Sequence, residues 1–274
     1  MAGDPAIARP RLHGSPPSRI AVLHGGPGAP GSARGLARAL ASGRGVLECL
    51  QSATSVDGQV EELRAQLEAH AAPPLAVVGH SWGAWLGSLL AAKHAHLVGV
   101  LVLVGSGPFE ASYADQILPR RLARLTEEEA AEARCCLADL DRPDAPADAL
   151  ARLGALFGKA DAYDPLPSDE DALVEDEPLA LQPAVYASVW REANELRRSG
   201  ELLSWAGMVR CPVLAIHGAD DPHPAEGVAA PLSRVLGDFR LVLLDRCGHE
   251  PWRERWARAA FLDALERELA VAGY

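Results

Sequence analysis

The sequence predicts an α/β fold, a mostly parallel sheet covered by helices on both faces. Short continuous apolar runs recur along the chain, Gly or Pro follows most of them, and helical stretches come after most of them. Continuous apolar runs are typical of strands buried on both faces, and alternation with helices is typical of parallel sheets. The 274 residues, 49% hydrophobic and 23% charged, fit one large domain or a core with an insertion.

The first part of the chain supplies most of the expected sheet. The first 17 residues are rich in Pro, Gly and Arg and show no periodicity. We expect strands at residues 19–24, 45–50, 75–79 and 97–104. We expect helices at residues 32–41, 58–70 and 82–93. Asp57 is the expected N-cap of the second of these helices, because Asp favours that position.

Residues 108–205 break this alternation. They contain no comparable β-branched run, and Pro- and acid-rich loops separate helical stretches at residues 126–140, 148–157 and 183–198. Strands resume at residues 212–217 and 239–244, each followed by a helical stretch. We therefore predict a core made of residues 1–107 and 206–274, with residues 108–205 as a helical insertion mounted on the sheet.

Charge and composition exclude several classes of function. The formal net charge of −11 has the wrong sign for binding nucleic acid or an anionic membrane surface. The five cysteines, an odd number without repeated CxxC spacing, argue against a disulfide framework or a zinc site. The N-terminus lacks the apolar region of a signal peptide, and the longest apolar run is far shorter than a membrane helix. We expect a cytoplasmic protein.

The clearest catalytic motif is Gly-His-Ser-Trp-Gly at residues 79–83. It lies between a predicted buried strand and a predicted helix, which is the context that gives a G-x-S-x-G match its meaning. The turn is so sharp that the residues two before and two after the serine must be almost free of side chain. Ser81 is therefore the candidate nucleophile, held at a helix N-terminus where the dipole favours negative charge.

A serine nucleophile needs a base and an acid that orients the base. Asp220 and Asp221 follow the strand expected at residues 212–217, and His249 follows the last strand. The carboxyl ends of the strands are where open α/β sheets bind their ligands, and the order Ser, Asp, His along the chain matches the G-x-S-x-G arrangement. The residues alone leave both aspartates open.

A second glycine motif, His-Gly-Gly-Pro-Gly at residues 24–28, follows the first strand. Its glycines allow a tight turn that presents a backbone N–H. Together with the N–H of Trp82, the N–H of Gly26 would form an oxyanion hole. His24 and His80 flank the site and are expected to be structural hydrogen-bonding partners. Several tryptophans are candidates for the pocket wall, with core packing as the alternative: Trp82, Trp85, Trp190 and Trp205.

These motifs together resemble the α/β-hydrolase superfamily over nearly the whole chain. The family pattern places the acid three residues after Gly218, which selects Asp221 and makes Ser81, Asp221 and His249 the implied catalytic triad. The residues 108–205 correspond to the family's cap. The His-Gly-Gly-Pro-Gly form is similar to the proline iminopeptidase branch, although the elbow reads Gly-His-Ser and that branch's amine-binding signature is not found. The segment before the first expected strand is too short for the two opening strands common in the family, which implies a sheet with fewer strands.

We therefore expect a serine hydrolase that cleaves a small-molecule ester, thioester or amide through an acyl-enzyme on Ser81. The alternatives are a proline iminopeptidase-like aminopeptidase and a low-turnover ligand-binding protein that retains the triad. A third alternative is a C–C or haloalkane hydrolase on the same fold; Ser81 disfavours the haloalkane version, because that chemistry uses an Asp nucleophile. No metal or organic cofactor is implied, the expected partner is a small-molecule substrate, and the sequence does not indicate an oligomeric state.

Overall fold

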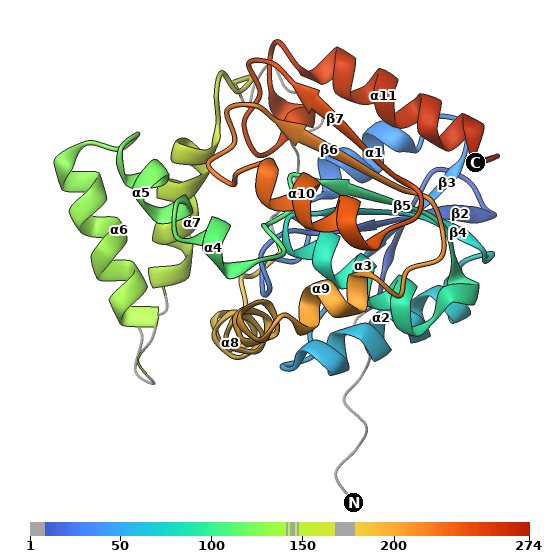
Figure 1. Cartoon of the computed structure of the whole chain (residues 1–274), viewed down its shortest axis with the longest axis horizontal. Helices are drawn as coiled ribbons and strands as arrows, with labels where there is room; N and C mark the ends of the chain where they lie inside the picture. Colours follow the sequence, from blue (N-terminus) through green and yellow to red (C-terminus); the bar gives the residue numbers. More distant parts are fainter. Residues whose placement is uncertain (1–8, 141, 143–145, 147, 168–178) are drawn as a thin grey trace, which may run out of the picture.

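The computed structural model describes residues 9–140, 142, 146, 148–167 and 179–274 (Figure 1). One seven-stranded sheet forms the centre, in the order β1-β3-β2-β4-β5-β6-β7. Its strands are β1 (Arg11–His13), β2 (Ser18–Leu23), β3 (Gly45–Cys49), β4 (Leu75–His80), β5 (Val98–Val104), β6 (Val213–Gly218) and β7 (Phe239–Leu244). β1 pairs antiparallel with β3, and every other pairing is parallel. The predicted α/β fold class is confirmed.

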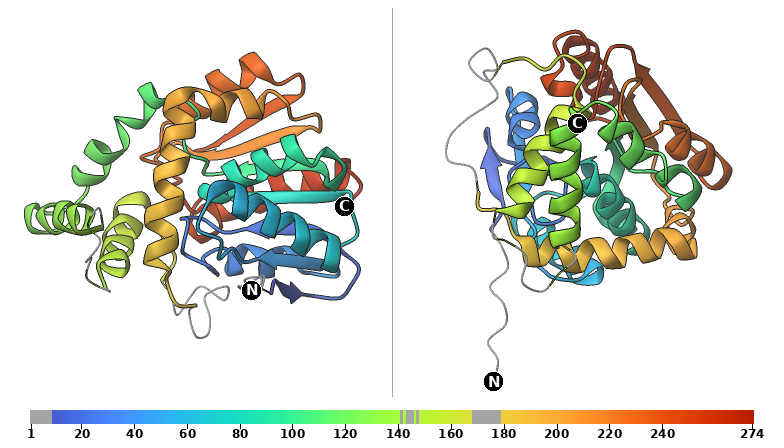
Figure 2. Two further views of the ribbon diagram at one scale, coloured as in Figure 1. Left: turned by 90° about the horizontal axis from the view of Figure 1, so that it is seen from below. Right: turned by 90° about the vertical axis from the view of Figure 1, so that its left-hand side faces the viewer.

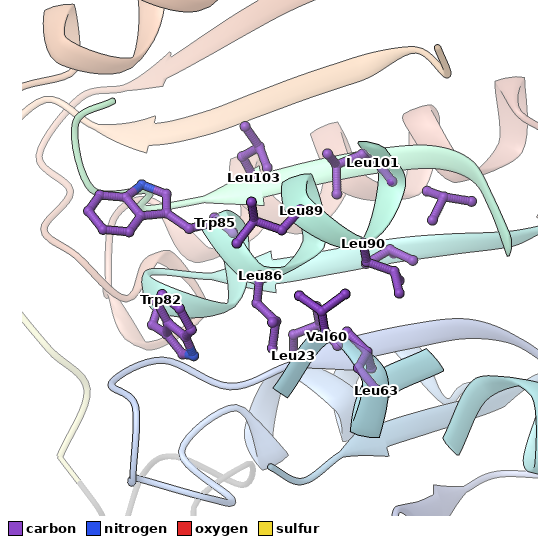
Figure 3. Close-up of a cluster of buried hydrophobic side chains, with 14 of the residues drawn as sticks. Leu23, Val60, Leu63, Trp82, Trp85, Leu86, Leu89, Leu90, Leu101 and Leu103 are labelled. Carbon is purple, nitrogen blue, oxygen red and sulfur yellow. The ribbon is translucent and has the colours of Figure 1, made fainter. Parts of the chain in front are cut away.

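Helices cover both faces of the sheet because the strands are apolar on both sides. Along β2, Ala21 and Leu23 belong to one buried cluster, and Ile20 and Val22 belong to the other. The first cluster lies under α2 (Val56–His70), α3 (Trp82–Lys93), α9 (Glu201–Ala206) and α10 (Glu226–Val235). The second lies under α1 (Arg34–Leu40) and α11 (Arg258–Val271). Figure 3 shows leucines of α3 between the sheet and α2.

The described parts of the chain between β5 and β6 consist of helices and connecting loops. They contain α4 (Ala111–Ala114), α5 (Ile117–Leu122), α6 (Glu127–Leu140), α7 (Ala149–Asp161) and α8 (Pro183–Ser199), followed by α9. α6 and α7 pack on each other around a small apolar cluster of their own. Figures 1 and 2 show α5, α6 and α7 at the side of the molecule away from the C-terminus. The division into a core and a cap remains our proposal.

Several elements differ from the sequence-based expectation. The strand β1 lies in the lead that was expected to have no regular structure, and three residues are too few for a periodicity to be visible. Ser55, not Asp57, caps α2, because the Ser55 side chain accepts a hydrogen bond from the N–H of Gly58 at 3.1 Å. Asp57 instead pairs with Lys93. The short helices α4, α5 and α9 were not predicted.

Among the described residues, no helix is both long enough and apolar enough to span a membrane.

Candidate active site

Ser81 occupies a strained turn between β4 and α3. Its backbone φ is +53° and its ψ is −113°, outside the regions that L-residues ordinarily adopt. A Cβ on Gly79 would lie 2.2 Å from the carbonyl oxygen of Gly83, and a Cβ on Gly83 would lie 2.6 Å from that of Leu23. Both flanking positions therefore require glycine. The turn holds the serine at the N-terminus of a twelve-residue helix.

The acid and the base lie in two loops at the carboxyl ends of neighbouring strands. Asp221 follows β6 and His249 follows β7, and the Nδ1 of His249 lies 2.7 Å from the Oδ2 of Asp221. Both residues are buried. Asp220 is half-buried and Asp245 is exposed. The structure thus brings Asp221, rather than either neighbouring acid, against the imidazole, and places Ser81 and His249 in the wall of one cavity.

The electrostatics of this pair suit an imidazole that must take up a proton. Burial alone would raise the pKa of the Asp221 carboxyl, but His249 and His223 hold it well below its usual range. Burial alone would lower the pKa of His249, but the Asp221 carboxylate outweighs this and raises it. Asp221 is therefore ionised, and its charge stabilises the protonated form of His249.

His223 is a site residue that the sequence reasoning missed. The Oδ1 of Asp221 accepts hydrogen bonds from the backbone N–H of His223 at 2.9 Å and from its Nδ1 at 2.8 Å. The His223 ring also stacks on the His249 ring, with 4.4 Å between centroids. Burial lowers the pKa of His223 to about 4, so this imidazole is neutral near pH 7. The spacing of Asp221 and His223, which suits an Asx turn, was the available signal.

Gly26 and Trp82 line the same cavity as Ser81. Trp82 is the first residue of α3, so its N–H has no partner within the helix. The backbone hydrogen bonds of the described residues leave the N–H of Gly26 unused. A Cβ on Gly25 would lie 2.7 Å from the Nδ1 of His80, which shows how closely the glycine loop packs on the elbow. This geometry is compatible with the expected oxyanion hole.

The two histidines beside the site make structural contacts. His80 Nε2 lies 3.1 Å from the carbonyl oxygen of His249 and holds the loop of the base. His24 Nδ1 lies 2.9 Å from the carbonyl oxygen of Gly25, at the glycine loop. Burial lowers the pKa of both imidazoles.

All five cysteines are free thiols, and burial raises the pKa of Cys247.

The cavity over Ser81 has a volume of about 920 Å³, and both the sheet side and the helices between β5 and β6 line it. Three of the four candidate tryptophans reach it. The rings of Trp85 and Trp190 stack with centroids 6.0 Å apart, and Trp82 lies 6.3 Å from Trp85. Trp205 packs against Lys93 instead, outside the cavity wall.

A buried ion pair, also missed, joins two of these helices beside the base. Both carboxylate oxygens of Asp161 accept from Arg121, at 2.7 and 2.5 Å, and the backbone carbonyl of Asp161 accepts from the N–H of His249 at 2.9 Å. Asp161, His223 and His249 bring possible metal-ligand atoms within 4.8 Å of one another. However, the Arg121 guanidinium already donates to both carboxylate oxygens of Asp161 and lies 3.5 Å from His223. Its positive charge would repel a metal cation bound at this position. No local sequence pattern signals this pair.

The sequence matches the alpha/beta hydrolase family over residues 12–260. No curated protein matches it. Its fold is similar to that of VinJ, with a TM-score of 0.64, 18% identity, and coverage of 96% of this chain and 94% of VinJ.

A proline iminopeptidase from Mycobacterium smegmatis gives a TM-score of 0.62 at 18% identity, over 96% of this chain and 94% of the other. CarC, a serine hydrolase involved in carbazole degradation, gives 0.59 at 18% identity, over 96% and 95%. At these identities the likeness shows a shared fold.

Proposed function

The chain belongs to the alpha/beta hydrolase family, and we propose on that premise that it is a serine hydrolase with Ser81, His249 and Asp221 as its triad. The substrate is a small-molecule ester, thioester or amide. One observation carries the proposal: the buried Asp221 and His249 side chains lie 2.7 Å apart at the cavity that also holds Ser81 in its strained turn. That pairing supports acyl transfer because it orients the imidazole and stabilises its protonated form.

In the proposed mechanism, Ser81 Oγ attacks the substrate carbonyl while His249 Nε2 takes its proton. The backbone N–H groups of Gly26 and Trp82 stabilise the oxyanion of the tetrahedral intermediate. His249 then donates the proton to the leaving alcohol, thiol or amine, and an ester bond to Ser81 remains. A water molecule, deprotonated by His249, hydrolyses this acyl-enzyme and restores the serine. Asp221 stays ionised throughout and keeps the Nδ1 proton of His249 in place.

We further propose that the helices between β5 and β6 act as a cap that shapes the substrate pocket. Tyr186 and Trp190 of α8 line the cavity together with Trp82 and Trp85 of α3. A cavity wall formed by both the cap helix α8 and the core helix α3 excludes water from the reacting carbonyl, which strengthens the electrostatic interactions there. Residues 168–178, which include most of the acidic residues of segment 161–178 within the predicted cap, are outside the described residues.

A substrate panel tests the proposal. Acyl 4-nitrophenyl esters, a thioester and prolyl 4-nitroanilide are incubated with the wild type and with Ser81→Ala. We expect steady turnover of at least one substrate by the wild type, and a loss of several orders of magnitude in Ser81→Ala. Retained activity in Ser81→Ala would refute the proposal. A single burst without turnover would favour the binding-protein alternative, and turnover of the nitroanilide alone would favour an aminopeptidase.

A further inference from the structure

The charged side chains that line the cavity are, with one exception, paired with an opposite charge or saturated by backbone hydrogen bonds among the described residues. Arg121 pairs with Asp161, Arg253 pairs with Glu250 at 2.9 Å, and Lys159 pairs with Glu129 outside the wall. The carboxylate of Glu254 accepts from three backbone N–H groups, those of Tyr163, Asp164 and Gly248. The exception is Arg197.

Arg197 lies near the C-terminal end of α8, and its guanidinium is held in place without being neutralised. Its Nη2 donates to the Oδ1 of Asn194 at 2.6 Å, and its plane lies over the ring of Trp85, 5.3 Å from the centroid. Its Nε is buried without a hydrogen-bond partner, and no carboxylate of the described residues lies within ion-pair distance. Burial lowers its pKa, with the more distant Asp115 acting in the opposite direction. The guanidinium is therefore a positioned, partly desolvated cation.

The position of Arg197 relates it to the nucleophile. Trp85 follows Ser81 by four residues, which places it about one turn, roughly 6 Å, along α3. Arg197 lies over that tryptophan, and Ser81, Trp85 and Arg197 line the same cavity. A substrate in this cavity can therefore reach the serine and the guanidinium at the same time. The arrangement suits a substrate with a carbonyl at one end, an apolar middle and an anion at the other end.

We propose that Arg197 binds a carboxylate of the substrate, and that the substrate class is an ester or thioester whose acyl part ends in a carboxylate. Arg presents a planar fork of donors that matches a carboxylate, and such charge-assisted hydrogen bonds are stronger than neutral ones. The overall charge of −11 repels anions, so a local cation is needed to bind one. An amine-bearing substrate would meet an unneutralised cation. This inference rests on the proposed hydrolase function.

Three 4-nitrophenyl esters with six-carbon acyl chains test the proposal. The distal end carries a carboxylate (adipate), a methyl-capped carboxyl (monomethyl adipate) or an amine (6-aminohexanoate). We expect kcat/KM to be highest for the adipate ester, and Arg197→Met to lower the adipate-to-methyl-adipate ratio by about tenfold or more. Arg198→Met is the matched control, since Arg198 is exposed, pairs with Glu195 and lies next to Arg197 on the same helix. It should leave the ratio unchanged.

Calorimetric titration with the monoamide of adipate and with hexanamide, which lacks the distal carboxylate, gives a readout that does not need catalysis. We expect the adipate monoamide to bind the wild type and Ser81→Ala more tightly than hexanamide does, and Arg197→Met to remove that preference. If no ester is hydrolysed but the preference for the adipate monoamide depends on Arg197, the proposed function fails and the anion site stands. If esters are hydrolysed but Arg197→Met leaves both the kcat/KM ratio and the binding preference unchanged, the anion site is refuted. A wild-type preference for the amine ester would also refute it.

Discussion

Replacing Asp221 by Asn separates the orienting acid from its neighbour, because the structure specifies what each oxygen of Asp221 does. Oδ2 accepts from the Nδ1 of His249, and Oδ1 accepts from both the backbone N–H and the Nδ1 of His223. An Asn side chain has only one acceptor atom, so its amide nitrogen must face one of the two histidines. The backbone N–H of His223 cannot become an acceptor. The imidazole of His249 can, by moving its proton to Nε2.

The change of tautomer at His249 determines how much kcat should fall. With its proton on Nε2, His249 cannot take the proton of Ser81. We therefore expect Asp221→Asn to lower kcat by about 10⁴-fold, which corresponds to about 5 kcal/mol of transition-state stabilisation. The fold should survive, because the amide still hydrogen-bonds both partners. Asp220→Asn is the matched control: that residue is half-buried beside Asp221, and no hydrogen bond of its side chain connects it to His249 among the described residues. We expect it to lower kcat less than threefold.

The assay is steady-state hydrolysis of the best ester by both variants, with circular dichroism and thermal unfolding to establish that they are folded. Ester hydrolysis by the wild type gives the reference value. A decrease in kcat of less than tenfold in a folded Asp221→Asn variant would refute the role of Asp221 as the acid that orients His249. A larger loss in Asp220→Asn than in Asp221→Asn would transfer the role of the acid to Asp220.

Further outcomes follow from the same geometry. Because Asp221 raises the pKa of His249, kcat/KM should rise with pH through an apparent pKa above that of an ordinary histidine, and Asp221→Asn should move this rise to lower pH. An unchanged pH dependence would contradict the assignment. Gly79→Ala should lower the free energy of unfolding by about 2 kcal/mol or more, because the new Cβ would collide with backbone atoms. Gly158→Ala should raise it by about 0.5–1 kcal/mol, because this glycine lies in α7 with open space around it. Thermal unfolding of the two variants measures both effects. Trp190→Ala should change the ranking of esters by kcat/KM while fluorophosphonate labelling of Ser81 persists, and an unchanged ranking would argue against the cap proposal.

The features that could be predicted from the sequence are those with local causes. Continuous apolar runs predicted six of the seven strands, and glycines at 79 and 83 predicted the sharp turn because a side chain there would collide with backbone. The strand β1 was missed because it is stabilised by its pairing with β3 and not by a pattern of its own.

The missed parts of the site depend on contacts between distant segments. Arg121 and Asp161 lie in different helices 40 residues apart, and neither has a neighbour in sequence that marks it as buried. Arg197 and Trp85 are brought together only when α8 packs over α3. His223 is the exception, since its contact with Asp221 is local and the intervening proline favours a turn.

In the proposed reaction, Ser81 carries the acyl group after the alcohol, thiol or amine has left. Intact-protein mass spectrometry after rapid acid quenching of the wild type with its best ester measures this directly, and peptide mapping then locates the adduct. We predict a mass increase equal to the acyl group on the peptide that contains Ser81, formed and lost at rates consistent with turnover, and no such adduct in Ser81→Ala. An adduct on another residue, or undiminished hydrolysis by Ser81→Ala, would contradict the account.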